Sequence, residues 1–432
     1  MLFRIAALLV SGLMVTASVP SSQPSAPGVG SLHPTAAPMS APQADQTSTP
    51  PDVVAEFNAI NAAARAARER GDAAGYLANA RKLAAFTPSH PGLQVALARG
   101  MGLEGDRSGA VAQLNKIADL GFSFDAGNDT AFQRMKDDPG FVAAAKRLAE
   151  NGKGTGRSKG IIKLGLTGGS EGVAWSESSK SFLMGSSGSI YAYKLDGDGA
   201  AKPVAKAGGS QILGIRPDPA HRSYLVCVNE PDGSNSGVVR HDEATSKIKE
   251  VYKLPLPNAY SNDLALLRKG SFAVTDSNNG VFHLVNGKLE RLRLTMPVYQ
   301  PNGIASDLDK NRLYVAHAGG VVVHDVTTGK SWEIAVTGTL IGGIDGMVWH
   351  KGSLIGVQNP ARMASRLLRI TPDAHAKTAR VDVLLAGADF PGHVSTVAIN
   401  GDDAFVIGVT GGANGEREEP VLIRAARVGY GR

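Results

Sequence analysis

Four acidic or amide residues in the second half of the chain stand at the head of short apolar runs: Glu171 before Gly-Val-Ala-Trp, Asn262 before Asp-Leu-Ala-Leu, Asn302 before Gly-Ile-Ala, and Asp345 before Gly-Met-Val-Trp. Together they offer two carboxylates and two amides, without His or Cys. Such hard oxygen donors suit Ca²⁺ much better than Zn²⁺, and two carboxylates balance a divalent charge. If the four side chains meet, they predict a calcium site, with another divalent cation as the alternative.

The spacing of these residues indicates that they do meet. Asn262 and Asn302 are 40 residues apart, and Asn302 and Asp345 are 43 residues apart. Paired strands at intervals of about 40 to 45 residues are typical of the blades of a β-propeller, in which the innermost strand of each blade lines the central channel. Equivalent strand heads therefore converge on one axis, and Glu171 heads the first blade. Taken singly, each site also fits a hairpin turn, as Asn286-Gly287 does.

The region from about residue 160 to residue 432 has the alternation and turn residues of an all-β fold. At the observed spacing, roughly 270 residues make about six blades. A jelly roll or double sandwich stays open as the alternative. Strands are predicted at residues 181–184, 190–194, 224–228, 237–241, 272–275, 281–285, 313–316, 321–325, 354–357, 366–370, 404–409 and 420–425.

Residues 51–151 have helical periodicity instead, and Gly71-Asp72 recurs as Gly105-Asp106 after 34 residues. This period resembles the tetratricopeptide repeat, in which stacked helix pairs leave a concave face for a protein partner. A small helical bundle that only packs against the rest is the alternative. The Gly- and Lys-rich stretch at residues 153–163 is interpreted as a solvated joint between this domain and the propeller.

The first 50 residues are predicted to be a targeting segment and a linker rather than part of a folded domain. Residues 1–19 combine a positive charge with an apolar stretch and are interpreted as a signal peptide, so we expect a secreted or periplasmic protein with no integral membrane span after cleavage. Retention as an anchor helix is the alternative. Residues 20–50, rich in Pro and Ser, are predicted to be a disordered linker. Cys227 is the one cysteine, so no intrachain disulfide can form.

Composition favours a globular protein and argues against a nucleic-acid partner. Apolar residues make up 43% of the chain and charged residues 19%, which allows a substantial core. The formal net charge of +6 comes from basic residues interleaved with acids, without an aromatic-basic RNA-binding motif.

The second half of the chain resembles the senescence-marker-protein/gluconolactonase family, whose relatives include paraoxonases and diisopropyl-fluorophosphatase. The similarity lies in residues 171–175, 261–266 with 273–276, 301–305 with 313–316, 345–349, and 395–398 with 406–409. The resemblance implies a six-bladed, calcium-dependent hydrolase. It also implies that Glu171, Asn302 and Asp345 bind the catalytic metal, that Asn262 is a fourth ligand or a substrate contact, and that Asp345 is the candidate general base.

Two positions depart from that family. Gluconolactonases have an arginine two residues before the Asn-Asp pair, and this chain has Tyr260 there, which argues against a sugar lactone. Paraoxonases have a second acid directly after the metal-binding glutamate, and this chain has Gly172, so a second calcium ion is not inferred. We expect Tyr260, Asn262 and His317 at the substrate pocket.

The residues thus predict Ca²⁺-dependent hydrolysis of a lactone or related ester, with the metal polarising the carbonyl and Asp345 assisting the attack of water. The principal alternative is a non-catalytic periplasmic binding or scaffold propeller whose helical repeats recruit a partner. A serine hydrolase is a lesser alternative, because Ser170 lies in a G-x-S-x-G motif. That motif requires a helix after the serine, and residues 173–175 read as a strand.

Overall fold

The computed structural model describes residues 51–166, 170–197, 199–360, 362–387, 390, 393–410 and 419–428. The signal peptide predicted at residues 1–19 and the linker predicted at residues 20–50 lie outside the described residues. Thr49–Arg432 form one compact unit, which contains a helical region followed by a β-propeller.

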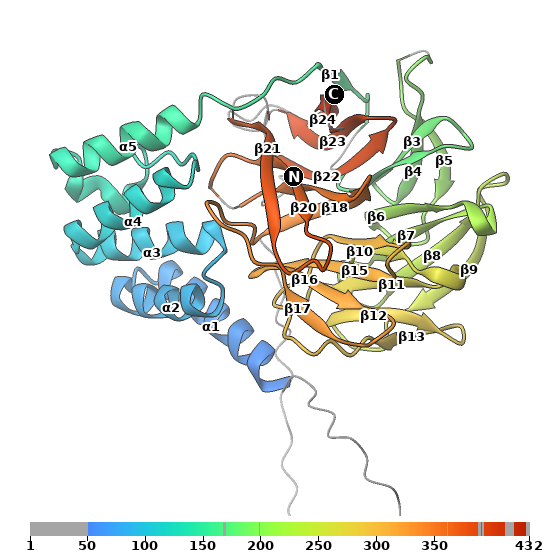
Figure 1. Ribbon diagram of the computed structural model, residues 1–432, viewed down its shortest axis with the longest axis horizontal. Coiled ribbons are helices and arrows are strands. Elements are labelled where there is room, and N and C mark those ends of the chain that lie inside the picture. Colours follow the sequence, from blue (N-terminus) through green and yellow to red (C-terminus); the bar gives the residue numbers. More distant parts are fainter. Residues whose placement is uncertain are drawn as a thin grey trace, which may run out of the picture. The chain divides into compact units, whose positions relative to one another are not determined.

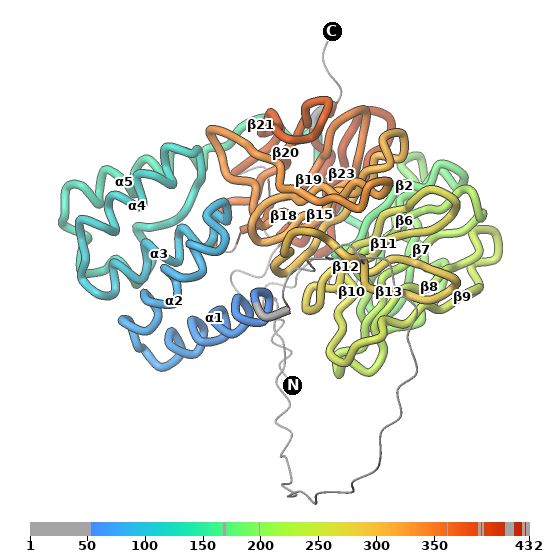
Figure 2. Tube along the Cα trace, turned by 60° about the horizontal axis from the view of Figure 1, so that its bottom comes forward, coloured from blue at the N-terminus to red at the C-terminus, as the bar shows by residue number. Residues whose placement is uncertain are grey.

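Five α-helices and a 3-10 helix make up the helical region in the described chain, and each α-helix packs against the next (Figures 1 and 2). Proline in the first turn begins α3 and α5, where its missing N–H costs no helical hydrogen bond. The elements are α1 (Pro51–Glu69), α2 (Ala73–Phe86), α3 (Pro91–Glu104), α4 (Arg107–Asp119), η1 (Thr130–Met135) and α5 (Pro139–Asn151).

The 34-residue repeat has a counterpart in the starts of α2 and α4. Gly71 and Gly105 both adopt a positive φ, at 71° and 83°, directly before the helix caps. The side chains of Asp72 and Asp106 then accept hydrogen bonds of 2.8 and 2.9 Å from the backbone N–H three residues later. The two Gly-Asp pairs thus turn the chain in the same way, while membership of the tetratricopeptide family stays a prediction.

The strands of the described residues form six antiparallel sheets of four strands each. The predicted six-bladed propeller, preceded in the sequence by a small helical region, is therefore confirmed. Six separate sheets exclude the jelly roll and the double sandwich. All twelve predicted strands overlap observed ones. The blades are β2 (Val173–Ser176), β3 (Ser181–Ser186), β4 (Ser189–Tyr193), β5 (Lys202–Lys206); β6 (Gln211–Asp218), β7 (Ser223–Asn229), β8 (Ser236–Asp242), β9 (Ile248–Lys253); β10 (Ser261–Leu266), β11 (Phe272–Asp276), β12 (Gly280–Val285), β13 (Lys288–Arg291); β14 (Ile304–Asp307), β15 (Arg312–His317), β16 (Gly320–Asp325), β17 (Ser331–Glu333); β18 (Ile344–His350), β19 (Ser353–Gln358), β20 (Arg366–Pro372), β21 (Ala379–Ala386); and β22 (His393–Asn400), β23 (Asp403–Thr410), β24 (Glu419–Arg427) with β1 (Gly160–Lys163).

Apolar residues fill the space between neighbouring blades, and this packing determines which strands are continuously hydrophobic. In β7, Leu225 belongs to the cluster shared with the third blade, whereas Val226 belongs to the cluster shared with the first blade. A strand buried on both faces has no polar side, so β7 is buried along its whole length. The core is therefore a ring of inter-blade clusters around the axis.

The last blade is completed by a strand that precedes the first blade in the sequence. Residues Gly160–Lys163 form β1, which pairs with β24 so that Ile161 lies opposite Ile423 and Ile162 opposite Leu422. The solvated joint predicted at residues 153–163 is therefore wrong for its last four residues. They read as a linker because β1 is an outer edge strand, and three of its four residues are exposed.

The helical region packs on the propeller at the end where β14 and β18 begin. Tyr299, just before β14, has its ring centroid 4.9 Å from that of Phe57 and 5.8 Å from that of Phe86. The N–H of Gly342, just before β18, donates a 3.0 Å hydrogen bond to the carbonyl oxygen of Ser89. The contact is apolar at its centre, so the helices and blades bury surface together.

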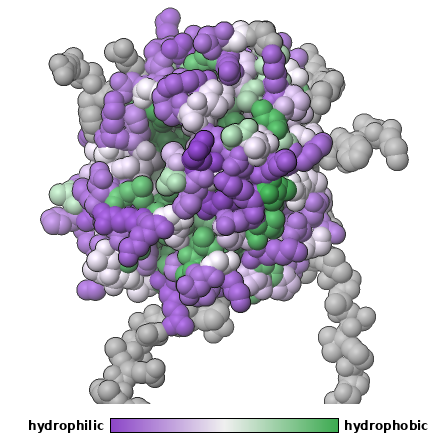
Figure 3. All heavy atoms as spheres, turned by 90° about the vertical axis from the view of Figure 1, so that its right-hand side faces the viewer, coloured by the Kyte–Doolittle hydropathy of each residue, from purple (hydrophilic) through white to green (hydrophobic). Residues whose placement is uncertain are grey.

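The outer surface is largely hydrophilic on the face shown in Figure 3, with separate hydrophobic areas between polar side chains. Large exposed hydrophobic residues occur on the outer parts of the first two blades, among them Val204, Ile248 and Val251. Within the described ranges, no helix has both the length and the apolar character needed to cross a membrane.

Candidate functional site

Each blade contributes one dipeptide at the head of its innermost strand, and the six dipeptides surround the propeller axis. In four of these strands the pairing with the second strand is interrupted at the dipeptide, as between Ser261 and Leu264 of β10. Such β-bulges re-aim side chains, here towards the axis. The dipeptides are Glu171-Gly172, Leu213-Gly214, Asn262-Asp263, Asn302-Gly303, Asp345-Gly346 and Ser395-Thr396.

Glycine is the second member of four dipeptides because neighbouring inner strands approach too closely for a side chain. A Cβ at Gly172 would lie 1.7 Å from the carbonyl oxygen of Leu213, and a Cβ at Gly346 would lie 2.0 Å from Oγ1 of Thr396. Separations this short exclude any substituent. In the third blade Asp263 takes this place, and its carboxylate spans the gap to the fourth blade.

We therefore expect Gly172→Ala to lower the free energy of unfolding by about 3 kcal/mol, because the backbone of the second blade must move away. Urea denaturation measures this change. Gly127→Ala is the matched control, since the nearest atom to its Cβ would be 3.9 Å away. Equal stability of the two variants would contradict close packing around the axis.

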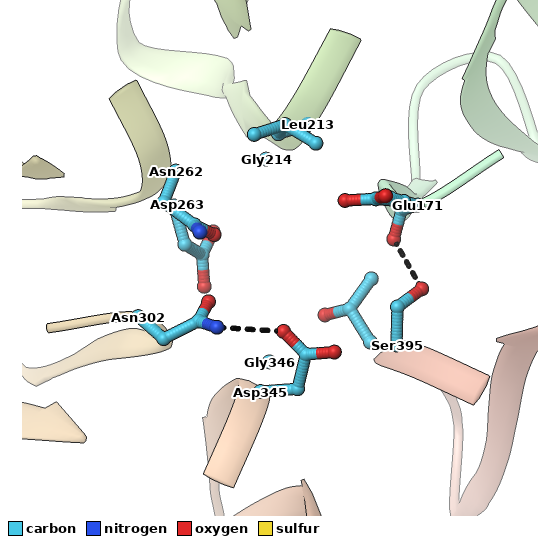
Figure 4. A pocket seen from close by; sticks show the side chains of 10 residues that line it. Glu171, Leu213, Gly214, Asn262, Asp263, Asn302, Asp345, Gly346 and Ser395 are labelled. Carbon is cyan, nitrogen blue, oxygen red and sulfur yellow. Dashed lines mark hydrogen bonds between the residues drawn. The ribbon is translucent and has the colours of Figure 1, made fainter. Parts of the chain in front are cut away.

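The dipeptides enclose a small polar cavity of about 20 Å³, which is the size of one water molecule or one ion (Figure 4). Glu171, Asn262, Asn302 and Asp345, the four predicted metal ligands, all line it. Each comes from a different blade, and their side chains approach one space from different directions (Figure 4). The sequence spacing therefore brings them together as expected, while their role as ligands stays a prediction.

The two amides are held by their nitrogen atoms, which leaves their oxygens available. Asn302 donates from Nδ2 to Oδ1 of Asp345 over 2.8 Å, and its buried Oδ1 has no hydrogen-bond partner among the described residues. Asn262 donates from Nδ2 to Oγ of Ser277 over 3.0 Å. A buried, unpartnered amide oxygen costs free energy unless a ligand satisfies it.

Two of the three carboxyl groups that line the cavity, those of Glu171 and Asp345, have strongly raised pKa values, so their charged forms are destabilised. Burial raises the pKa of Asp345 to about 7, although the amides of Asn302 and Asn359 oppose the shift. Burial among the blades, followed by the charge of Asp345, raises the pKa of Glu171 to about 7, although this side chain keeps exposed surface towards the channel. A bound cation would relieve both effects.

These shifts predict how the stability of the metal-free protein depends on pH. Both carboxyl groups titrate near pH 4 when unfolded, so between about pH 4 and 7 the folded chain holds more protons. The free energy of unfolding should therefore fall as the pH rises through this range. Urea denaturation at several pH values in chelator measures the slope, and the double variant Glu171→Gln, Asp345→Asn should reduce it. An equal slope in the double variant would refute this assignment.

Asp263 lines the same cavity, but its carboxylate already accepts hydrogen bonds that join three blades. Its carboxylate, which is 5% exposed as a residue, accepts a 3.0 Å hydrogen bond from Nη2 of Arg216 in the second blade. It also accepts bonds from the backbone N–H of Leu264 and, at 3.2 Å, of Ile304 in the fourth blade. The charge of Asp263 is thus balanced by Arg216.

The structure does not bring His317 to this cavity. The imidazole lies at the end of β15, is 4% exposed as a residue, and lines a different cavity beside the helical region. Its expected contact with the substrate at the polar cavity is therefore not supported by the geometry. Tyr260 does lie within electrostatic range, because the charges of Glu171 and Asp345 add to burial in raising the pKa of its hydroxyl.

Sequence reasoning missed the contributions of the second and sixth blades. Leu213-Gly214 has no polar side chain, and Ser395 donates from Oγ to the carbonyl oxygen of Glu171 over 2.9 Å, which joins the last blade to the first. The signal that could have found them is positional: a dipeptide, often ending in Gly, followed by an apolar residue at each blade interval.

Two further polar residues lie close to the cavity. Nδ2 of Asn359 lies 3.0 Å from Nδ1 of His393, and the Asn359 side chain also hydrogen-bonds Asp345. His393 is exposed, and its charge favours the ionised form of Glu171. Ser170 is buried and precedes strand β2 rather than a helix, so the local structure required of a serine-hydrolase elbow is lacking there.

The donor set fits a hard divalent cation. The side-chain carboxylate of Glu171 accepts no hydrogen bond from a described residue, and the two amides donate from their nitrogens to Ser277 and Asp345, which leaves the amide oxygens available. Among the described residues, no group of three or more His, Cys, Asp or Glu is placed so that it could hold a metal ion. Carboxylate and amide oxygens are instead the ligands that Ca²⁺ prefers.

Fold and cavity together define a six-bladed propeller with an oxygen-lined site on its axis. No family model and no curated protein matches the chain. Among solved structures, the PQQ-bound aldose sugar dehydrogenase of Streptomyces coelicolor matches at 16% identity over 64% of this chain and 99% of that chain, with a TM-score of 0.46. A candidate gluconolactonase matches at 16% identity over 62% and 92%, with a TM-score of 0.45. Virginiamycin B lyase from Staphylococcus aureus matches at 13% over 61% and 99%, with a TM-score of 0.40. These likenesses concern the fold alone.

Proposed function

We propose that the axial cavity binds Ca²⁺ through Glu171, Asn262, Asn302 and Asp345, and that the protein hydrolyses a lactone or related ester there. The observation that carries the proposal is the unpartnered, buried Oδ1 of Asn302, held beside two carboxyl groups in a cavity of about 20 Å³. Another divalent cation that prefers oxygen ligands is the alternative occupant.

When bound, the cation would polarise a carbonyl oxygen and stabilise the negative charge that develops on it. The residues of this chain supply positioning and proton transfer. Asn302 orients the Asp345 carboxylate through the 2.8 Å hydrogen bond to Oδ1. The Asp345 carboxylate, held in this orientation, would take the proton of the attacking water.

The residues around the cavity favour a substrate that is not a sugar. Tyr260 lies near the two carboxyl groups and offers a partly buried aromatic ring and one hydroxyl. An apolar ring of this kind packs against an aliphatic or aromatic ester better than against several hydroxyl groups. We therefore propose that the protein shares the hydrolytic chemistry of the gluconolactonase-like family but does not act on a sugar lactone.

An activity panel tests the proposal. Purified protein is assayed against aliphatic lactones, aryl esters and organophosphates, with Ca²⁺ and with chelator, and Asp345→Asn serves as the catalytic control. Calcium-dependent turnover of a lactone or ester would support the proposal. Tight Ca²⁺ binding without turnover on any member of the panel would overturn the hydrolase assignment in favour of a binding or scaffold propeller.

The proposal includes an exported protein whose helical region contacts another protein. The proposal of export rests on the apolar residues 1–19. The proposal of a protein partner rests on the 34-residue repeat, in which Asp72 and Asp106 cap their helices in the same way. Subcellular fractionation of bacteria that express a tagged full-length chain tests whether the protein is exported. Retention in the cytoplasm with an intact N-terminus would contradict it.

A further inference from the structure

A second and much larger cavity lies between the α2–α3 connection and the fourth blade, including the segments that precede and follow that blade. Its volume is about 470 Å³, within the range of small-molecule sites, which run from about 300 to 1,000 Å³. The walls are mainly apolar or aromatic and include Phe86, Met296, Tyr299 and Val336. None of its lining residues lines the axial cavity.

His317 lines this cavity, and one of its ring nitrogens is a buried donor without a partner among the described residues. Its Nδ1 accepts hydrogen bonds from the backbone N–H of Tyr299 at 3.3 Å and of Gly319 at 3.2 Å. Burial lowers the pKa of the ring to about 3, so the imidazole is neutral and its proton resides on Nε2. That Nε2 is buried and has no partner among the described residues. An unsatisfied donor in an apolar wall calls for an acceptor.

Glu333 adds a hydrogen-bond acceptor to the lining of the same cavity. Its carboxylate lines the same cavity, keeps exposed surface at the edge, and accepts no hydrogen bond from a described residue. Two consecutive glycines lie between the two groups. A Cβ at Gly319 would be 2.6 Å from Cε1 of His317, and a Cβ at Gly320 would be 2.6 Å from Oε1 of Glu333. The donor and the carboxylate therefore flank one dipeptide.

We propose that this cavity is a second binding site, for a small organic molecule with an apolar or aromatic body, a carbonyl oxygen that accepts from His317, and a protonated amine that pairs with Glu333. The aromatic rings of Phe86 and Tyr299 suit both the apolar body and the cation. The inference does not depend on the proposed hydrolase activity, because the cavity shares no residue with the axial site.

L-Phenylalaninamide is a probe with all three features, and two analogues each lack one. 3-Phenylpropanamide lacks the amine, and phenethylamine lacks the carbonyl. Titration followed by calorimetry or protein NMR should show saturable binding of L-phenylalaninamide to the full chain, with a Kd of about 1 mM for a ligand of this size. Each analogue should bind about tenfold more weakly.

Two variants and a control complete the test. Glu333→Gln should weaken L-phenylalaninamide about tenfold and leave 3-phenylpropanamide unchanged. His317→Asn keeps an acceptor for the backbone N–H groups but removes the Nε2 donor, so it should weaken both amides and spare phenethylamine. Glu290→Gln, on the exposed outer strand β13, should change nothing. Absence of saturable binding, or binding that Glu333→Gln leaves unchanged, would overturn the proposal.

Discussion

Replacing Asp345 by asparagine should lower kcat/KM for the hydrolysed lactone or ester at least about a hundredfold, the usual contribution of a positioned general base. Asparagine has nearly the same shape and can still accept from Nδ2 of Asn302, so the fold should be retained. What is lost is the carboxylate, both as proton acceptor and as one of the two carboxylates proposed to bind the cation.

Asp309→Asn is the matched control for this experiment. Asp309 lies in an exposed turn at the far end of the same propeller, so its replacement should leave turnover unchanged. Circular dichroism of both variants checks that the blades are intact. Full activity of Asp345→Asn with metal bound would show that another group activates the water.

Removal of the cation should have the second large effect, on activity and stability together. A ligand that binds only the folded state stabilises it by about 2.7 kcal/mol when its concentration is a hundred times Kd. Chelation should therefore abolish turnover and lower Tm, because Glu171 and Asp345 are left facing each other without a counter-ion.

Restoring Ca²⁺ should recover both properties in the wild-type protein. The double variant Glu171→Gln, Asp345→Asn should show neither response, since it has lost both carboxylates proposed to bind the cation and the remaining one, Asp263, is paired with Arg216. A wild-type protein whose activity and Tm are the same in chelator and in Ca²⁺ would refute a cation role at this site.

The fold and the meeting of the four polar residues could be predicted from the sequence because both depend on period. Strands buried on both faces, such as β7, are recognisable as apolar runs, and their recurrence sets the number of blades. The same period places Asn262, Asn302 and Asp345 at equivalent positions, so their convergence needs no side-chain detail.

The features that the sequence did not reveal depend on tertiary contacts. β1 is short and exposed, so only its partner β24 makes it a strand. Gly172 and Gly346 resemble ordinary turn glycines, although the neighbouring blade is what excludes a side chain there. His317 is the last residue of β15 and is close in sequence to Asn302, so the sequence alone predicts a position beside Asn302. The packing of the helical region around Tyr299 instead gives it a different environment.

Calorimetric titration of the metal-free protein with Ca²⁺ tests the central proposal most directly, because it needs no substrate. We expect one ion per chain, bound in the axial cavity, with the heat of binding lost in the double variant Glu171→Gln, Asp345→Asn and retained in Asp309→Asn. A wild-type titration without saturable heat, or one that the double variant reproduces, would contradict a calcium site at the centre of the propeller.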